Sequence, residues 1–339
     1  AADPATGPAE AVAFAQAEVL AAADGAAGLR TGRAAVAIDD VLMETFEELD
    51  AARAAGRPVG LRTGFGELDA LLGAIPPGDY VLLGGRPSQG KTALALNVTL
   101  NAARAGVPAL VYSLEMQRKK LGRRLLAMEA GVDATAIRMA RLTEAQLTQM
   151  TAAAQRMIGL PLWVDDLGAL SAATLAAATR KHVHRHGPLG LLVIDYVGLM
   201  DGDGRAENTE KELKAISKAI KQLAMSLGCV ALVLAQLSRK CEERGDKRPV
   251  LSDLRDSGSL EQDADAVLFV YRDEYYHKKT KDPGVAEVIV AKQRDGATGT
   301  ARLRFARELT RFDDLEPAAA PYAAPTDWHD AEETDHAAE

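Results

Sequence analysis

The sequence of 339 residues has few cysteines, no long apolar run and no excess of positive charge. Its two cysteines, Cys229 and Cys241, are too few for a disulfide scaffold and lack the C-x-x-C spacing of a zinc site. No apolar run reaches the roughly 18 residues that a membrane span needs. The first basic residue is Arg30, so the N-terminus lacks the pattern of a signal peptide. We therefore expect a protein of the reducing cytoplasm, without membrane contact.

The net charge of −8 at neutral pH excludes a surface that is basic all over. Any contact with the phosphates of a nucleic acid must then be local, in a loop or a lined pore. The chain is long enough for one large domain or two small ones, with ample apolar content for a core.

A complete phosphate-binding loop, G-x-x-x-x-G-K-[ST], lies between an apolar strand at 80–83 and an Ala- and Leu-rich helix. Backbone N–H groups of such a loop face phosphate oxygens, and its glycines allow the close approach. The ammonium of Lys91 is expected to reach the β- and γ-phosphates, and the hydroxyl of Thr92 to hold Mg²⁺. We therefore predict that the chain binds a nucleoside triphosphate. The loop consists of Gly85, Arg86, Pro87, Ser88, Gln89, Gly90, Lys91 and Thr92.

From residue 61 to 315, apolar runs alternate with helical patterns, which predicts an α/β fold with a doubly wound, mostly parallel sheet. The last two strands have no helix between them and are expected to form an antiparallel hairpin. Strands are predicted at 80–83, 109–112, 162–164, 189–194, 230–234, 266–271, 286–291 and 300–305, and helices at 92–104, 117–130, 144–158, 172–186 and 207–227.

An amphipathic helix is predicted at 38–50, ahead of this domain, and the Gly-Arg-Pro sequence at 56–58 ends it. Its apolar face can pack on its own domain or dock in a groove of a neighbouring subunit. Both alternatives remain open from the residues alone.

Other strand ends carry polar groups suited to a triphosphate, because ligands of open α/β sheets bind at the carboxyl ends of strands. Asp195 ends an apolar strand, as in the Walker B arrangement that holds Mg²⁺. Glu115 follows another strand and could deprotonate an attacking water, or only cap the next helix. Gln236 could sense the γ-phosphate or be a plain polar strand terminus.

Lys292 and Arg294 close a later strand, where positions i and i+2 face the same side. Two cations on one side of a strand are expected to bind an anion. They could form a salt-bridged edge or reach the triphosphate of an adjacent subunit as an arginine finger.

Two loops are candidates for nucleic-acid contact, at 201–205 and, longer and more informative, at 238–263. The second loop mixes arginines and lysines with acids, which fits either phosphate-backbone contact or a solvated surface loop. It contains no aromatic residue, so base stacking is not expected there. The alternating histidines at 182, 184 and 186 lie in a predicted helix, where i and i+2 do not share a face, so we expect solvated residues rather than a metal site.

Together these segments resemble the C-terminal motor domain of the DnaB family of replicative helicases, over about residues 36–312. The motifs occur in family order and at family spacing. They are RPSQGKT (86–92), SLEM (113–116), IDY (194–196), DKRP (246–249), SDLRDSGSLEQDAD (252–265), YRDE (271–274) and AKQR (291–294).

The resemblance implies a RecA-like fold and a homohexameric ring that hydrolyses ATP with Mg²⁺ and moves 5′→3′ along single-stranded DNA. It implies that Lys91, Thr92 and Asp195 bind ATP–Mg²⁺, that Glu115 is the catalytic carboxylate and that Gln236 senses the γ-phosphate. It assigns Lys292 and Arg294 to the ATP site of the adjacent subunit, and Arg255, Asp256 and Gly258 to the DNA backbone in the central channel.

The resemblance also implies that the helix at 38–50 is the linker helix that docks on the next subunit, and that a helicase loader is a further partner. It leaves out the family's N-terminal helical domain, which contacts primase, so primase contact is doubtful. We expect a truncated piece or a short, phage-type homologue. The expected parts are a poorly ordered Ala/Gly-rich leader (1–35), the linker helix and linker (36–58), the ATPase domain (59–316) and a disordered acidic tail (317–339).

Two other functions fit the same nucleotide chemistry. A RecA-like recombinase or filament-forming ATPase shares the fold, although the signatures at 252–265 and 292–294 favour the helicase. A module that binds ATP without productive turnover is the non-enzymatic alternative, and the presence of Glu115 argues against it.

Overall fold

The computed structural model describes residues 36–56, 58–166, 168, 171–195, 197 and 209–315, without the side chains of 55, 209–212 and 255–259. The chain divides into two compact units, Ala1–Val59 and Gly60–Glu339. The predicted leader, the acidic tail and the loop at 201–205 lie outside the described residues. No described helix is long and apolar enough to cross a membrane.

The first unit contains helix α2 (Ile38–Ala55), which is five residues longer than the predicted helix at 38–50. Gly56 ends it in the left-handed conformation, with φ of 62°, and its N–H bonds back to the last turn. Asp39 and Asp40 in the first turn complement the positive end of the helix dipole. Within this unit the apolar side chains of α2 are exposed, among them Phe46 and Leu49.

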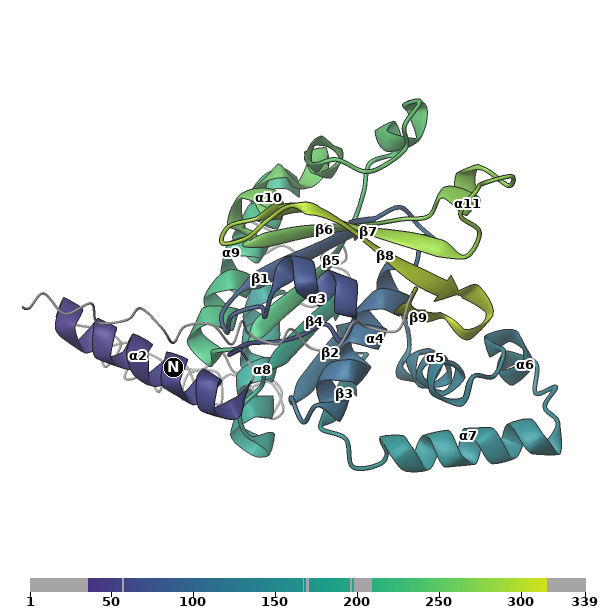
Figure 1. The fold of residues 1–339 in the computed structure, drawn as a ribbon, viewed down its shortest axis with the longest axis horizontal. Helices are drawn as coiled ribbons and strands as arrows, with labels where there is room; N and C mark the ends of the chain where they lie inside the picture. The colour runs from purple at the N-terminus through teal and green to yellow at the C-terminus, as the bar shows by residue number, and fades with distance from the viewer. Residues whose placement is uncertain are drawn as a thin grey trace, which may run out of the picture. The chain divides into compact units, whose positions relative to one another are not determined.

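The second unit is built on one nine-stranded sheet of order β3-β2-β4-β5-β1-β6-β7-β8-β9 (Figure 1). The strands from β3 to β6 in this order are parallel, and β6 to β9 are antiparallel. This confirms the mostly parallel sheet with a C-terminal hairpin, to which β9 adds a strand that was not predicted. The strands are β1 (Tyr80–Gly85), β2 (Ala109–Ser113), β3 (Leu162–Asp165), β4 (Leu191–Asp195), β5 (Val230–Gln236), β6 (Ala266–Tyr271), β7 (Val285–Gln293), β8 (Gly299–Ala306) and β9 (Arg311–Asp314).

Helices cover both faces of this sheet, and each face has its own buried core. Alternate residues of β1 show the division: Val81 and Leu83 belong to one core, and Leu82 to the other. The first core includes α3 (Gly66–Leu72), α4 (Lys91–Arg104) and α5 (Arg118–Ala130), and the second includes α8 (Ala172–His186), α9 (Thr209–Leu227) and α10 (Gly258–Asp263). The remaining helices are α6 (Ala134–Arg138), α7 (Glu144–Met157), α11 (Asp273–Tyr276) and the 3₁₀ helices η2 (Arg239–Glu243), η3 (Leu251–Ser257) and η4 (Arg307–Leu309).

The strand register decides which chain segments meet at each edge of the sheet. Gly85 pairs with Gln236, and Ser113 pairs with Asp195, so the carboxyl ends of β1, β5, β2 and β4 share one edge. Strand β7 runs the opposite way, and Gln293 pairs with the first residue of β6. Lys292 and Arg294 therefore lie at the opposite edge of the sheet from those strand ends. An antiparallel strand delivers its carboxyl end to the other side.

The histidine tract is part of a surface cluster. His182 and His186, four residues apart on α8, both contact the ring of Trp163 on β3, with centroids 4.8 and 5.1 Å away. Partial burial and the neighbouring charges of His186 and Arg185 lower the pKa of His182. The described residues contain no group of three or more His, Cys, Asp or Glu side chains placed to hold a metal ion.

Candidate active site

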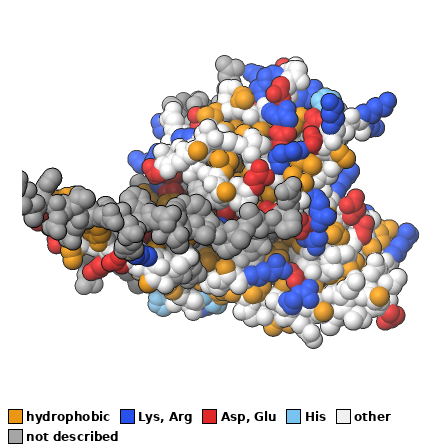
Figure 2. Space-filling model, in the orientation of Figure 1, with side chains coloured by type: hydrophobic (Ala, Val, Ile, Leu, Met, Phe, Trp, Pro, Cys, Tyr) orange, Lys and Arg blue, Asp and Glu red, His pale blue; other side chains and the backbone are white. Residues whose placement is uncertain are grey.

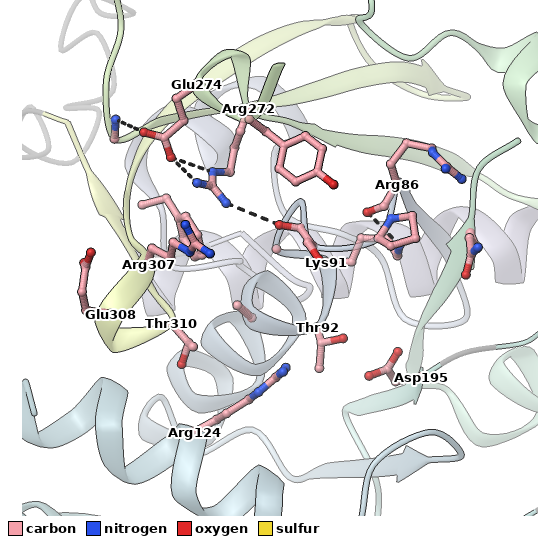
Figure 3. A pocket seen from close by; sticks show the side chains of 18 of the residues that line it. Arg86, Lys91, Thr92, Arg124, Asp195, Arg272, Glu274, Arg307, Glu308 and Thr310 are labelled. Atoms are coloured by element: carbon pink, nitrogen blue, oxygen red, sulfur yellow. Dashed lines mark hydrogen bonds and ion pairs between the residues drawn. The ribbon is translucent and has the colours of Figure 1, made fainter. Parts of the chain in front are cut away.

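The loop between β1 and α4 lines the floor of a cavity of about 1040 Å³ at the carboxyl edge of the sheet (Figure 3). Gly90 adopts a φ of 108°, and a Cβ at this position would lie 3.0 Å from the ring of Phe312. A side chain here would therefore strain the backbone and displace the ring. The loop conformation depends on this glycine, which directly precedes Lys91 at the start of α4.

Lys91 has no anionic partner within the described part of the chain, because its Nζ donates only to the carbonyl oxygens of Gly85 and Arg86. Burial lowers the pKa of the ammonium to about 8, although the charges of Asp195 and Glu115 act in the opposite direction. A bound phosphate would strongly stabilise such a buried cation, whose described partners are only carbonyl oxygens.

Asp195 ends β4 with only 4% of its surface exposed. Its Oδ2 has no hydrogen-bond partner among the described residues. Burial raises the pKa of the carboxyl, and Thr92, Lys91 and Arg124 offset part of that rise. A buried carboxylate oxygen without a donor, next to a threonine hydroxyl, fits a hard divalent cation such as Mg²⁺.

Glu115 and Gln236 lie on either side of this carboxylate and line the same cavity. Glu115 is exposed in the turn after β2, and that turn is fixed by a 2.7 Å bond from the N–H of Leu114 to the carbonyl of Asp195. Gln236 is the last residue of β5 and is also exposed. Both side chains are free to meet a ligand.

Three arginines that the sequence did not single out also line the cavity: Arg124, Arg272 and Arg307 (Figure 3). Arg124 extends from α5, and burial lowers its pKa while Asp195 and Glu115 oppose the change. It comes from a helix whose sequence gives no sign of the contact. Arg307 belongs to η4, more than a hundred residues after Lys91, Glu115 and Asp195 in the sequence.

Arg272, which follows β6, fastens the phosphate loop to the sheet. Its N–H donates to Gln89 Oε1 over 2.9 Å, its Nη1 lies 3.4 Å from the carbonyl of Ser88, and its guanidinium pairs with Glu274. The guanidinium also packs 4.5 Å from the centre of the Phe305 ring. Its only signal in the sequence was its place in the YRDE motif.

Arg86 was predicted to bind phosphate as part of the loop, but its side chain has other partners. Nε donates to Glu242 over 2.9 Å, and Nη1 donates to the carbonyl of Leu237 over 2.8 Å. The side chain therefore ties the phosphate loop to the segment that follows β5.

Lys292 and Arg294 lie at the opposite edge of the sheet and contact one segment, residues 261–265. Lys292 Nζ donates to the carbonyl of Glu261 over 2.6 Å, and Arg294 Nη1 donates to Asp265 over 3.0 Å. Strand β1 spans six residues from one edge to the other, or about 17 Å at roughly 3.3 Å a residue. Neither cation can reach the phosphate loop of its own chain.

The loop at 238–263 folds into η2, η3 and α10, and several of its cations are paired. Arg244 forms two 2.7 Å bonds with Asp253, and Arg248 bonds Glu287 with both Nε and Nη2. Arg255 and Asp256 lie in η3 and Gly258 begins α10, but the described side chains do not include these residues. On the face drawn in Figure 2, basic and acidic side chains are interspersed.

Comparison with known proteins matches residues 60–314 to the family model of the DnaB-like helicase C-terminal domain. The replicative DNA helicase DnaB of Geobacillus stearothermophilus is 38% identical over 82% of this chain and 62% of its own length. The replicative DNA helicase DnaC of Bacillus subtilis has the same values. The chain thus spans less than two thirds of these curated relatives.

Two solved structures share the fold. One, an isolated ATPase domain, has a TM-score of 0.79 and 34% identity, over 84% of this chain and all of that one. The other, a DnaB-like replicative helicase studied with its interactions with primase, has a TM-score of 0.76 and 32% identity, over 91% of this chain and 76% of that one.

Proposed function

The chain belongs to the DnaB-like helicase family, and we propose that it is the ATP-driven motor of a replicative DNA helicase. It hydrolyses ATP at the interfaces of a homohexameric ring and moves 5′→3′ along single-stranded DNA. The observation that carries the proposal is a separation within the chain. Lys292 and Arg294 lie at the opposite end of the strands from the phosphate-loop cavity, about the length of β1 away. A site divided in this way needs a second subunit to be complete.

On its own chain the cavity supplies the groups that bind the triphosphate. Lys91 meets the β- and γ-phosphates, and Thr92 and Asp195 would hold Mg²⁺, which when bound neutralises phosphate charge. Glu115 accepts the proton of the attacking water, because it is exposed to the cavity and lies next to the strand that bears Asp195. Gln236 donates its amide to the γ-phosphate. Arg124 adds a cation beside Glu115 and Asp195.

Lys292 and Arg294, here called the finger residues, complete the ATP site of the next subunit. Charge develops on the phosphoryl oxygens in the transition state, and a cation brought in across the interface stabilises it. The half-exposed guanidinium of Arg294 is available to such a neighbour.

Arg255, Asp256 and Gly258 hold the DNA backbone in the ring channel. Support comes from the family match over residues 60–314, which includes these three residues, and from their position in η3 and at the first residue of α10. Recognition of phosphates without base stacking fits the absence of aromatic residues from 238–263.

The exposed apolar side chains of α2 support docking on a further copy of the chain, the helix-in-groove mode. We place the assembly in the cytoplasm, with a helicase loader as the partner that puts it on DNA. The interactions with primase named for the structural relative are a property of that protein.

Strand displacement from a forked duplex with a 5′ tail tests this function. Unwinding should require ATP and fall about 100-fold or more in Glu115→Gln, because the base that accepts the proton is lost. Glu144→Gln, an exposed change at the start of α7, is the matched control and should unwind normally.

Other outcomes would point to the alternatives. Strand exchange without displacement would indicate a recombinase. Hydrolysis that DNA does not stimulate, with Glu115→Gln no slower than the wild type, would indicate a module that binds ATP without using it.

A further inference from the structure

Asp265 is a buried carboxylate at the edge of the sheet that carries the finger residues. It precedes β6 and is 6% exposed. Its Oδ2 accepts the N–H of Tyr80 over 2.8 Å and the ammonium of Lys221. Its Oδ1 accepts from Arg294 Nη1 over 3.0 Å, and its own carbonyl accepts the N–H of Arg294 over 2.9 Å.

These bonds fix Arg294 at both its backbone and its guanidinium. The guanidinium has a third contact, because Nη2 lies 3.3 Å from the carbonyl of Gln262. Half of the side chain is nevertheless exposed. Asp265 thus bonds the backbone N–H and the Nη1 atom of Arg294, and the exposed half of the side chain stays free to bind an anion.

The same segment joins both finger residues to α10. Lys292 bonds the carbonyl of Glu261 and Arg294 bonds that of Gln262, and both carbonyls lie within α10. Leu260 and Ala264 are fully buried in the core, so this stretch is firmly packed. Helix α10 begins at Gly258, two residues after Asp256, and DNA contact is proposed at Arg255, Asp256 and Gly258.

A second helix meets the same carboxylate. Lys221 lies on α9, and its Nζ also donates to the carbonyl of Gly78 over 3.0 Å. Because Lys221 binds Oδ2 and Arg294 binds Oδ1, the two cationic partners of Asp265 can be removed one at a time.

We propose that Asp265 is a positioning residue that holds Arg294 in place for the ATP site of the next subunit and joins it to the DNA-contacting start of α10. Helix α10 and Arg294 are bonded within residues 261–265, so DNA contact at the start of α10 is linked to the position of the finger through this packed segment. The inference rests on the proposed function, since it needs Arg294 to act in trans. It assigns a role to a carboxylate that touches neither nucleotide nor DNA.

Removal of the charge at Asp265 should impair turnover and not ATP binding. In Asp265→Asn, DNA-stimulated kcat should fall about 10- to 100-fold, as expected when a catalytic group is misplaced by about 1 Å, while KM for ATP changes less than about twofold. The matched control is Lys221→Met, which removes the other cation from the same carboxylate and should keep the wild-type kcat. Asp265→Glu keeps the charge, moves it by one methylene and should give an intermediate kcat if Asp265→Asn does not fold.

Mixed rings separate positioning from a general loss of structure. A minority of Asp265→Asn chains, mixed with an excess of Lys91→Met chains, receives intact fingers from its neighbours, and its ATP sites should recover turnover. An excess of the double variant Lys91→Met, Asp265→Asn should give no recovery.

The inference is overturned if Asp265→Asn and Asp265→Glu keep the wild-type kcat, if Lys221→Met loses as much, or if intact fingers restore nothing. Failure of the proposed function would look different. In that case wild-type hydrolysis would not respond to DNA, or Arg294→Ala would be fully active.

Discussion

The two edges of the sheet differ in whether their buried charged side chains are paired within the chain. At the carboxyl edge, Lys91, Glu115, Arg124 and Asp195 form no ion pair within the described part of the chain, and burial shifts the pKa values of three of them toward the neutral form. At the other edge, Asp265 is buried with two cations and a backbone N–H bonded to it. The groups at the first edge suit a phosphate-bearing ligand. At the second edge the carboxylate is already satisfied within the chain, and we propose that the cation it holds, Arg294, acts at the next subunit.

The largest effect that would test this contrast is expected from Arg294→Ala. An arginine finger contributes about 1,000-fold or more to turnover, so DNA-stimulated kcat should fall by that amount. ATP affinity should stay near the wild-type value, because the groups that bind ATP lie at the other edge. Equilibrium binding of a fluorescent ATP analogue and steady-state hydrolysis measure the two quantities. A similar loss in both would show that the edges are not independent.

Lys91→Met should weaken ATP binding and at the same time stabilise the nucleotide-free chain. Loss of the ammonium should reduce turnover about 100- to 1,000-fold and weaken ATP binding. A lysine whose pKa falls on folding, here from 10.5 to about 8, destabilises the fold at all pH values below about 8, and the cost fades as the pH rises toward 10.5. Its removal should therefore raise the Tm of the nucleotide-free chain, by roughly 2–4 °C for each kcal/mol regained.

Thermal unfolding followed by circular dichroism measures that change in Tm. Lys120→Met, on the exposed part of α5, is the control and should leave Tm and turnover near wild type. A lower Tm in Lys91→Met would mean that the ammonium is already well solvated or paired.

ATP affinity should depend on pH in the range set by Lys91. Below pH 8 the ammonium is charged before ATP arrives. Above about pH 8 it must take up a proton on binding, so affinity should fall by up to about tenfold for each pH unit. Isothermal titration calorimetry at saturating Mg²⁺ between pH 7 and 9.5 follows the change. A flat profile in the wild type would contradict the pKa, and Lys91→Arg, charged throughout, should be flat if it binds ATP.

The smallest effect concerns Arg86, which is paired at the carboxyl edge. Glu242→Gln removes its carboxylate partner, and because Glu242 is partly exposed the pair contributes only about 0.2–1 kcal/mol. ATP affinity should fall by at most about 5-fold as the phosphate loop loosens. Glu243→Gln, the exposed neighbour, should change nothing. An equal effect from both variants would mean that general charge, and not the bond to Arg86, is responsible.

Much of the sheet could be predicted because buried parallel strands are continuous apolar runs. Strand β6 has its predicted bounds, and β1 differs only by two glycines at its end. Strand β9, of sequence RFDD, was missed because only Phe312 is buried there, and α3 was missed because seven residues give too short a periodic signal.

The candidate site was predictable where a motif lies on one strand and its turn, as for Lys91 and Asp195. Arg124 and Arg307 were not, since tertiary packing alone brings their helices to the cavity. The pairing of Arg294 with Asp265 was not predictable either, because it depends on the antiparallel direction of β7. Local pattern identifies residue types, and strand direction decides which site they serve.

The central claim, that each ATP site is shared between chains, can be tested directly by mixing two inactive variants. Lys91→Met has an intact finger, and Arg294→Ala has an intact phosphate loop. After the two chains are combined and annealed with single-stranded DNA, some interfaces contain one intact half from each, so DNA-stimulated ATP hydrolysis should rise well above the sum of the separate variants. A mixture no more active than that sum would contradict the account.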